Sequence, residues 1–185
     1  MLYWHGWDPA STKADRVVLT GGMADRRLDP PEAALALHPL GPGATGGIDM
    51  LVRRSAFDGV GGFEARFRGR YEDEAFLMKI FLRYPIYISS RSWYYYRQHP
   101  DSCCGQTTPA DWSKVRGAFL DYLQELEDDG RLADPRVRAA FRRARHAFPY
   151  QKLAYQLYGR LPLRLKWYML EHRWQGRAAT AHNAG

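Results

Sequence analysis

Three consecutive acidic residues, Glu72, Asp73 and Glu74, stand at the start of an apolar segment and follow a loop with a Gly-Gly pair at 61–62. A carboxylate can act as the general base that takes a proton from an attacking hydroxyl group. Neighbouring acids raise one another's proton affinity, which favours such a role. Acidic residues at a helix start are also expected from capping and from the helix dipole. The spacing alone therefore leaves both interpretations open.

A second group of polar residues, Arg97, Gln98 and His99, follows an aromatic run further along the chain. If a strand continues through these positions, Arg97 and His99 lie on the same face. Arginine binds phosphate oxygens through two donors, and neutral histidine can be a metal ligand. The alternative interpretation is a pair of surface polar residues ahead of the turn at 100–102.

Taken together, these segments resemble the acceptor-side half of the family-2 glycosyltransferases, whose domain has the GT-A fold. In that family a Gly-Gly-Phe or Gly-Gly-Trp segment precedes a helix that begins with an acidic pair, and the aspartate of the pair is the catalytic base. Gly61, Gly62 and Phe63 match the segment, and Glu72-Asp73 matches the pair. The resemblance covers residues 46–102, with several short matches in the family's order.

The resemblance implies inverting transfer of a sugar from a nucleotide-sugar donor to a hydroxyl group of a saccharide, a lipid-linked or another acceptor, as in polysaccharide biosynthesis. Asp73 would be the base, and Glu72 would orient the site or the acceptor. The segment 61–63 would shape the acceptor pocket. Arg97 and His99 would face the pyrophosphate or a divalent metal, Mg or Mn, with His99 as its ligand.

The donor-side half of the family has no counterpart in this sequence. No strand, nucleotide-binding loop and helix precede the matching segment, and no Asp-x-Asp motif occurs. We therefore expect the C-terminal part of a glycosyltransferase, truncated or completed by a partner chain, with weak or no activity alone. Residues 1–104 would form the acceptor-side half, and residues 105–185 would form a basic helical extension.

The net charge of +7 is concentrated towards the end of the chain. Between 131 and 177 there are many Lys and Arg residues, but the only acids are Asp134 and Glu171. The segment 160–174 mixes such cations with Leu, Trp and Tyr, a pattern found in interfacial helices. This supports an alternative function, a non-catalytic module that docks on a partner domain or an anionic membrane surface. Nucleic-acid binding is disfavoured, because no recognised motif accompanies the charge.

Composition sets further expectations. The chain of 185 residues has only two cysteines, Cys103 and Cys104, and adjacent cysteines do not make a disulfide framework. Neither a signal peptide nor an apolar stretch of membrane-spanning length is recognisable. We expect a cytoplasmic protein, with a peripheral position at the inner face of the membrane as a variant of that expectation.

The elements predicted from the sequence indicate an α/β fold with a C-terminal helical region. The resemblance implies that the α/β part is a partial GT-A-like mixed sheet with helices. Strands are predicted at 16–20, 48–53, 86–89 and 93–96 from their apolar, β-branched and aromatic content. Helices are predicted at 31–38, at 55–58 with Ser55 as cap, at 73–84, from Thr108 to Gly130, from Asp134 to Pro149, and at 162–174. Pro149 is expected to end or kink its helix.

Overall fold

Five short strands and five helices occur in the part of the chain that the computed structural model describes, namely residues 2–4, 8, 10–11, 14–17, 22–43, 50–97, 99, 101–102 and 106–158. The strands are β1 (Leu2–Trp4), β2 (Arg16–Val17), β3 (Arg26–Leu28), β4 (Ile86–Ile88) and β5 (Tyr95–Arg97). The helices are α1 (Glu32–Ala36), α2 (Arg54–Gly59), α3 (Glu72–Arg83), α4 (Pro109–Asp128) and α5 (Pro135–Tyr158).

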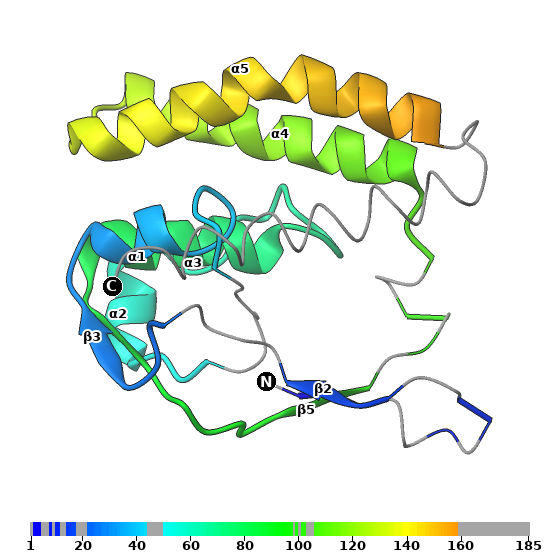
Figure 1. Ribbon diagram of the computed structural model, residues 1–185. Helices are drawn as coiled ribbons and strands as arrows, with labels where there is room; N and C mark the ends of the chain where they lie inside the picture. Colours follow the sequence, from blue (N-terminus) through cyan, green and yellow to red (C-terminus); the bar gives the residue numbers. More distant parts are fainter. Residues whose placement is uncertain are drawn as a thin grey trace.

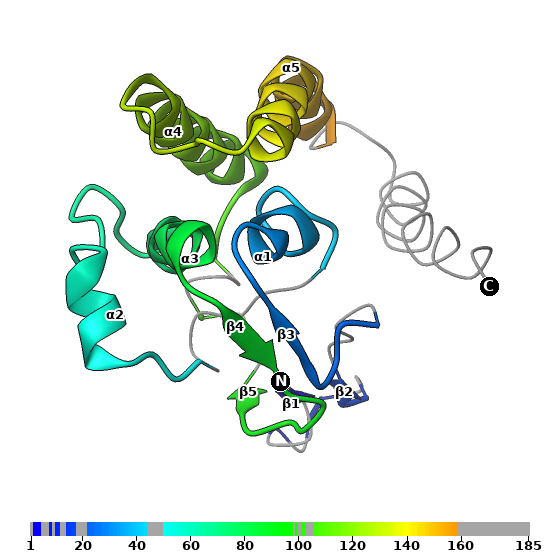
Figure 2. The same ribbon diagram turned by 90° about the vertical axis from the view of Figure 1, so that its left-hand side faces the viewer.

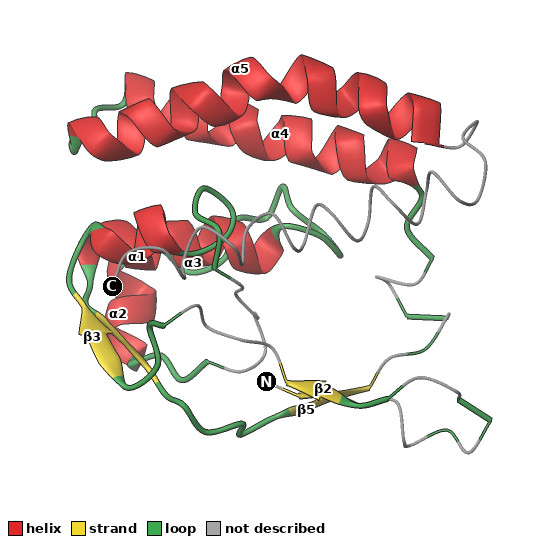
Figure 3. Ribbon diagram, viewed as in Figure 1, coloured by secondary structure: helices red, strands yellow, loops and turns green. Residues whose placement is uncertain are grey.

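These elements form layers (Figure 1). The antiparallel pair α4 and α5 lies over α1 and α3, and the strands lie on the other side of α1 and α3. Figure 3 shows the same division by colour, with the helices above and the strands below. The chain thus combines α and β structure, as predicted, while the finer GT-A assignment stays a prediction.

The strands pair into two small sheets. In the first, β1 lies between β2 and β5, antiparallel to β2 and parallel to β5. In the second, β3 and β4 pair antiparallel, with Leu28 opposite Ile86. Figure 2 shows this second pair directly beneath α1 and α3. The first sheet carries Arg97 at the end of β5, so it positions one of the predicted site residues.

Helix α3 is the central element of the core. Seven consecutive residues of this helix, 75–81, are buried, so it is covered on more than one face. It packs against α1, and residues of α4 and α5 belong to the same apolar cluster. The helix ends at Arg83, before Pro85, because the residue that precedes a proline is disfavoured in helical conformation. The prediction of a helix over 73–84 is confirmed.

Helices α4 and α5 form a hairpin whose start the sequence also predicts. The Thr108 side chain accepts a hydrogen bond from the Asp111 amide, and the Asp111 side chain accepts one from the Thr108 amide. This reciprocal pair is a capping box. Gly130, at φ 72°, ends the turn after α4 in the left-handed region that favours glycine. Because the core cluster draws residues from both sides of the predicted boundary at 104–105, that boundary stays a prediction.

Helix α5 continues through Pro149 to Tyr158, so the prediction that the helix ends there is wrong. Proline inside a helix removes one hydrogen bond and costs about 3 kcal/mol. Packing on α4 offsets this cost. The preceding residue, Phe148, packs against the core, and its ring approaches Gly117 of α4.

Two further expectations differ from the structure. Residues 50–53 form no strand, and Leu51 is fully exposed. No described strand pairs with this stretch, so its backbone has no inter-strand hydrogen bonds that would stabilise a strand. Residues 48–49 lie outside the described residues. The N-cap of α2 is Arg53, two residues before the predicted cap Ser55.

A buried ammonium group joins the loop before α3 to the helix itself. The Lys79 side chain is only 3% exposed, and Nζ donates to the Gly62 carbonyl at 2.6 Å and to Glu64 Oε1 at 2.7 Å. Glu64 also accepts a hydrogen bond from the Tyr122 hydroxyl of α4 at 3.4 Å. Burial alone would raise the pKa of Glu64, but the hydrogen bond and charge of Lys79 lower it. The loop, α3 and α4 are therefore connected through one ion pair.

We predict that Lys79→Met lowers the free energy of unfolding by about 2–3 kcal/mol, because it leaves the Glu64 carboxylate and the Gly62 carbonyl without their buried donor. Urea denaturation followed by circular dichroism measures the loss. Arg54→Ala is the matched control, since it removes an exposed ion pair with Asp58 worth less than about 0.5 kcal/mol. Equal losses in the two variants would contradict the structural role of Lys79.

Candidate active site

The start of α3 is fixed by an unusual backbone conformation at Tyr71. This N-cap residue has φ 60° and ψ 8°, the left-handed region that non-glycine residues seldom adopt. Its side chain is buried, with the ring centroid 4.9 Å from that of Phe119 on α4 and 6.1 Å from that of His38. Such conformations persist where the surrounding packing holds them. The packing of Tyr71 thus determines where the three acids begin.

The three acids are partly buried in the first turn of α3. Asp73 Oδ1 accepts a hydrogen bond from the Glu74 amide at 3.0 Å. Glu74 Oε1 lies 3.7 Å from His38 Nε2. One oxygen of Glu72 and one of Glu74, Oε2 in each case, are buried without a hydrogen-bond partner. The N-cap residue Tyr71 makes no side-chain cap bond, but Asp73 pairs with the Glu74 amide, one of the first-turn amides that have no partner within the helix. Capping therefore accounts for Asp73 in part, and the helix dipole favours all three acids.

The environment of Glu74 favours its neutral form. Burial raises the pKa of Glu74 to about 9, together with the hydrogen bond and charge of Asp73 and the charge of Glu72. The sequence predicts mutual repulsion among three adjacent acids. The structure places that effect at Glu74, with burial as its largest cause. Glu74 is thus a carboxylic acid at neutral pH, next to the aspartate predicted to be the base.

The Gly-Gly-Phe segment lies against the same helix. Gly61 and Gly62 have φ 75° and 65°, so both occupy the left-handed region. The Phe63 ring is half exposed, and its centroid lies 4.6 Å from that of Phe76 on α3. Phe76 is three and four residues after the acidic pair 72–73, hence on the same side of the helix. The structure therefore brings the segment 61–63 together with the face of α3 that carries the predicted base.

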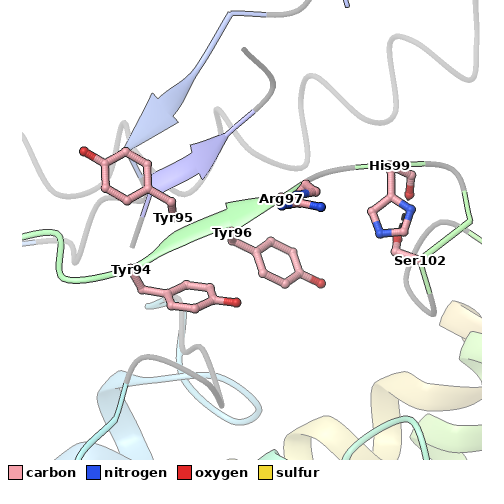
Figure 4. Close-up of a pocket in the computed structure, with 6 residues that line it drawn as sticks. All are labelled: Tyr94, Tyr95, Tyr96, Arg97, His99 and Ser102. Carbon is pink, nitrogen blue, oxygen red and sulfur yellow. Dashed lines mark hydrogen bonds between the residues drawn. The ribbon is translucent and has the colours of Figure 1, made fainter. Parts of the chain in front are cut away.

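Arg97 and His99 lie elsewhere, in a depression of about 400 Å³ that is also lined by Tyr94, Tyr95, Tyr96 and Ser102. Figure 4 shows these side chains around β5 and the turn that follows it. The described strand ends at Arg97, so His99 lies beyond it and the alternation argument does not apply. The His99 carbonyl instead accepts hydrogen bonds from the Ser102 amide at 3.2 Å and from its hydroxyl at 2.8 Å.

Neither Glu72 nor Asp73 is among the residues that line this depression. The two predicted groups are connected through the residues beside them. Arg70, just before Tyr71, donates to the Thr107 hydroxyl, and its guanidinium carbon lies 4.2 Å from the Trp112 ring centroid. The chain segment that follows the depression is thereby attached to the loop that leads into α3.

The metal-ligand role predicted for His99 is not supported by a cluster of candidate ligands in the described part of the chain. There, no three His, Cys, Asp or Glu residues are gathered in a way that could hold an ion. Mg and Mn prefer several oxygen ligands, and the residues described around His99 do not supply that set. The ligand role of His99 stays a prediction.

Lys79 contacts the predicted site, because it donates to the Gly62 carbonyl, and His38 faces Glu74 beside that site. Arg116 donates to the Pro39 carbonyl at 3.2 Å, next to His38 in the sequence. Nothing in the spacing of His38 or Arg116 indicates these positions, because both are far from the acids in sequence. A lysine within the apolar pattern of α3 is the one signal that could have been followed, since a buried lysine requires a partner.

The basic character of α5 is largely compensated where the helix is described. Arg142 pairs with Glu127 and Arg145 with Asp121, both on α4. Arg136 pairs with Asp134 and with Glu32 of α1. The proposed interfacial segment 160–174 lies outside the described residues. Among those that are described, no helix has the length and apolar character that would be needed to cross a bilayer.

The pKa of Glu74 generates a prediction about stability. The unfolded carboxyl group loses its proton above its ordinary pKa of 4.5, whereas the folded one keeps it up to about 9. The folded state therefore binds more protons in this range, and the free energy of unfolding of the wild type falls as the pH rises. We expect the free energy of unfolding of Glu74→Gln to equal that of the wild type near pH 4.5. Near pH 9 it should be larger than that of the wild type by about 2–4 kcal/mol.

Chemical denaturation across that pH range measures the difference. Glu125→Gln is the control, because it removes an exposed carboxylate that pairs with Arg66, and its effect should stay within about 0.5 kcal/mol. A constant difference between wild type and Glu74→Gln at every pH would show that Glu74 is ionised in the folded protein.

The Gly-Gly pair offers a matched test of the loop. An added Cβ at Gly62 would lie 2.9 Å from the Phe57 ring, whereas at Gly61 it would meet open space. Both substitutions to alanine carry the left-handed penalty of about 1–2 kcal/mol, and Gly62→Ala adds about 1–3 kcal/mol of overpacking. Thermal denaturation compares the variants, and a loss at Gly61→Ala equal to or larger than that at Gly62→Ala would contradict this packing.

Comparison with protein-family models, with characterised proteins and with solved structures found no match to this chain.

Proposed function

We propose that this chain is the acceptor-side part of an inverting glycosyltransferase, with Asp73 as its general base. The observation that carries the proposal is the attachment of the Gly-Gly-Phe segment to the helix of the acidic pair. That attachment consists of the hydrogen bond from Lys79 to the Gly62 carbonyl and the contact of Phe63 with Phe76. Both parts of the resemblance thus belong to one packed unit.

The proposed chemistry needs one base. The hydroxyl oxygen of the acceptor attacks the anomeric carbon of the donor sugar, and Asp73 takes the hydroxyl proton as the new carbon–oxygen bond forms. The bond to the diphosphate oxygen breaks on the opposite side, which inverts the configuration. The nucleoside diphosphate leaves without a general acid. Glu72, beside the base in the same turn of α3, would orient the acceptor.

The acceptor would approach over the segment 61–63. Phe63 offers a half-exposed aromatic ring at the helix that carries Asp73, and sugars pack well on such flat apolar faces. The two glycines have no side chains, so no side-chain atoms of these residues cover the surface beside the Phe63 ring. This arrangement favours a saccharide or a lipid-linked saccharide over a small unbranched alcohol.

Arg97 and His99 would serve the donor side. The Arg97 guanidinium is exposed in the depression that also contains His99, and its donors match the geometry of diphosphate oxygens. Because the depression is apart from the acids in the described residues, a donor would have to bridge the two. A partner chain that supplies the donor-binding half would provide that bridge, so weak activity is expected from this chain alone.

Release of nucleoside diphosphate tests the proposal. The purified chain, at high concentration, is incubated with a panel of UDP-, GDP- and dTDP-sugars, saccharide acceptors and Mg or Mn, and the products are separated by chromatography. We expect slow release that falls by about 10²–10⁴-fold in Asp73→Asn, the loss typical of a removed general base. Asparagine keeps an oxygen acceptor for the Glu74 amide, so the fold is retained.

Asp58→Asn is the control, since Asp58 is an exposed acid on α2 that pairs with Arg54. Its rate should equal that of the wild type. Equal rates in the wild type and Asp73→Asn would refute the role of Asp73. If no release is detected, saturation-transfer NMR tests binding with the same panel, and a chain that binds neither donors nor acceptors is not a glycosyltransferase part.

A further inference from the structure

We propose that Glu74 is a positioning residue, which donates a hydrogen bond from its neutral carboxyl group to the Asp73 carboxylate and so holds that carboxylate in place. This inference rests on the proposed function, because it assigns Glu74 a role beside the proposed base. The matching segment gives Glu74 no role, since the acidic pair is Glu72-Asp73.

The first argument is the unsatisfied buried oxygen of Glu74. Its Oε2 atom is buried and has no hydrogen-bond partner, and a hydrogen bond to the Asp73 side chain is among the causes that raise the pKa of Glu74. Two ionised carboxylates in contact offer acceptors only. A proton between them turns a repulsive contact into a hydrogen bond and removes the cost of an unpaired buried charge.

The groups around Glu74 leave the proton on it. On its own helix it faces the acids Glu72 and Asp73, which disfavour a further negative charge. From the turn after α1, His38 Nε2 lies 3.7 Å from Oε1, which is longer than a hydrogen bond. Lys79 of α3 donates to Gly62 and Glu64, and Arg116 of α4 donates through Nη2 to the Pro39 carbonyl, while its Nη1 is buried without a hydrogen-bond partner.

The second argument is that Glu74 reaches Asp73 twice. Its backbone amide donates to Asp73 Oδ1 at 3.0 Å, and the hydrogen bond between the two side chains is the second cause, after burial, of the raised pKa of Glu74. Two donors from one residue restrict the rotation of the Asp73 side chain. The residue that supplies both donors is itself fixed by burial in the first turn of α3, so the orientation of the proposed base is set before any acceptor arrives.

The protonation of Glu74 can be measured without a substrate. In protein labelled with ¹³C at side-chain carboxyl carbons, the Glu74 resonance is followed across the pH range in the wild type and in Asp73→Asn. We expect a wild-type midpoint near 9 and a midpoint lower by at least about one pH unit in Asp73→Asn, where the neighbouring charge is absent. Glu125→Gln should leave the midpoint unchanged.

An ionised Glu74 at neutral pH, or a midpoint that is the same in Asp73→Asn, would overturn the inference. This readout is separate from the test of the proposed function. If Glu74 and Asp73 are coupled while Asp73→Asn still releases nucleoside diphosphate at the wild-type rate, then the glycosyltransferase proposal fails, and the coupling remains as a property of the fold.

A second experiment asks whether the hydrogen bond affects the reaction. Glu74→Gln keeps an N–H donor for Asp73 and should retain the rate of diphosphate release within about threefold, whereas Glu74→Leu, which has no donor, should lose at least about tenfold. In the wild type, the rate of diphosphate release should decline above about pH 9, where Glu74 loses its proton. This decline should be absent in Glu74→Gln. Equal rates in Glu74→Leu and the wild type, with the fold confirmed by denaturation, would refute the positioning role.

Discussion

The structure depends on a single buried ammonium group. Lys79 is the one charged side chain within the run of buried residues in α3, and it must be paired where it lies. Its partners are a loop carbonyl and a carboxylate that also contacts α4. The ion pair stabilises the fold only when Lys79, the Gly62 carbonyl and Glu64 are all in place. It therefore couples the position of the Gly-Gly loop to the packing of the helical hairpin.

Burial has a different effect on the acids in the first turn of α3, where it raises the pKa of Glu74. There the described groups that act on Glu74 are two carboxylates, which raise its pKa, and a histidine whose Nε2 lies 3.7 Å from Oε1. The helix therefore carries a satisfied charge at Lys79 and an unsatisfied carboxyl oxygen at Glu74 within two turns of each other. The two groups on this helix therefore have different roles: Lys79 holds the Gly-Gly loop, and Glu74 acts on the proposed base.

Local signals were enough to predict the helices. The apolar spacing and Pro85 delimit α3, and Thr108 with Asp111 marks the start of α4. The strand predicted at 48–53 was wrong for 50–53, because strand formation needs a partner that local sequence does not reveal. For the site, sequence identified the acids and the Gly-Gly-Phe segment. It could not identify His38, which meets Tyr71 and Glu74 only through the packing of the folded chain.

The left-handed backbone at Tyr71 has a consequence for how this region could vary. A helix cannot propagate backwards through a residue in that conformation, so α3 cannot gain a turn at its N-terminus. A change of loop length at the exposed positions 68–69 would leave the rotational phase of the first turn unchanged. The carboxylates would then point in the same direction whatever the length of the connection, which makes the tyrosine a fixed reference point for the whole acidic turn.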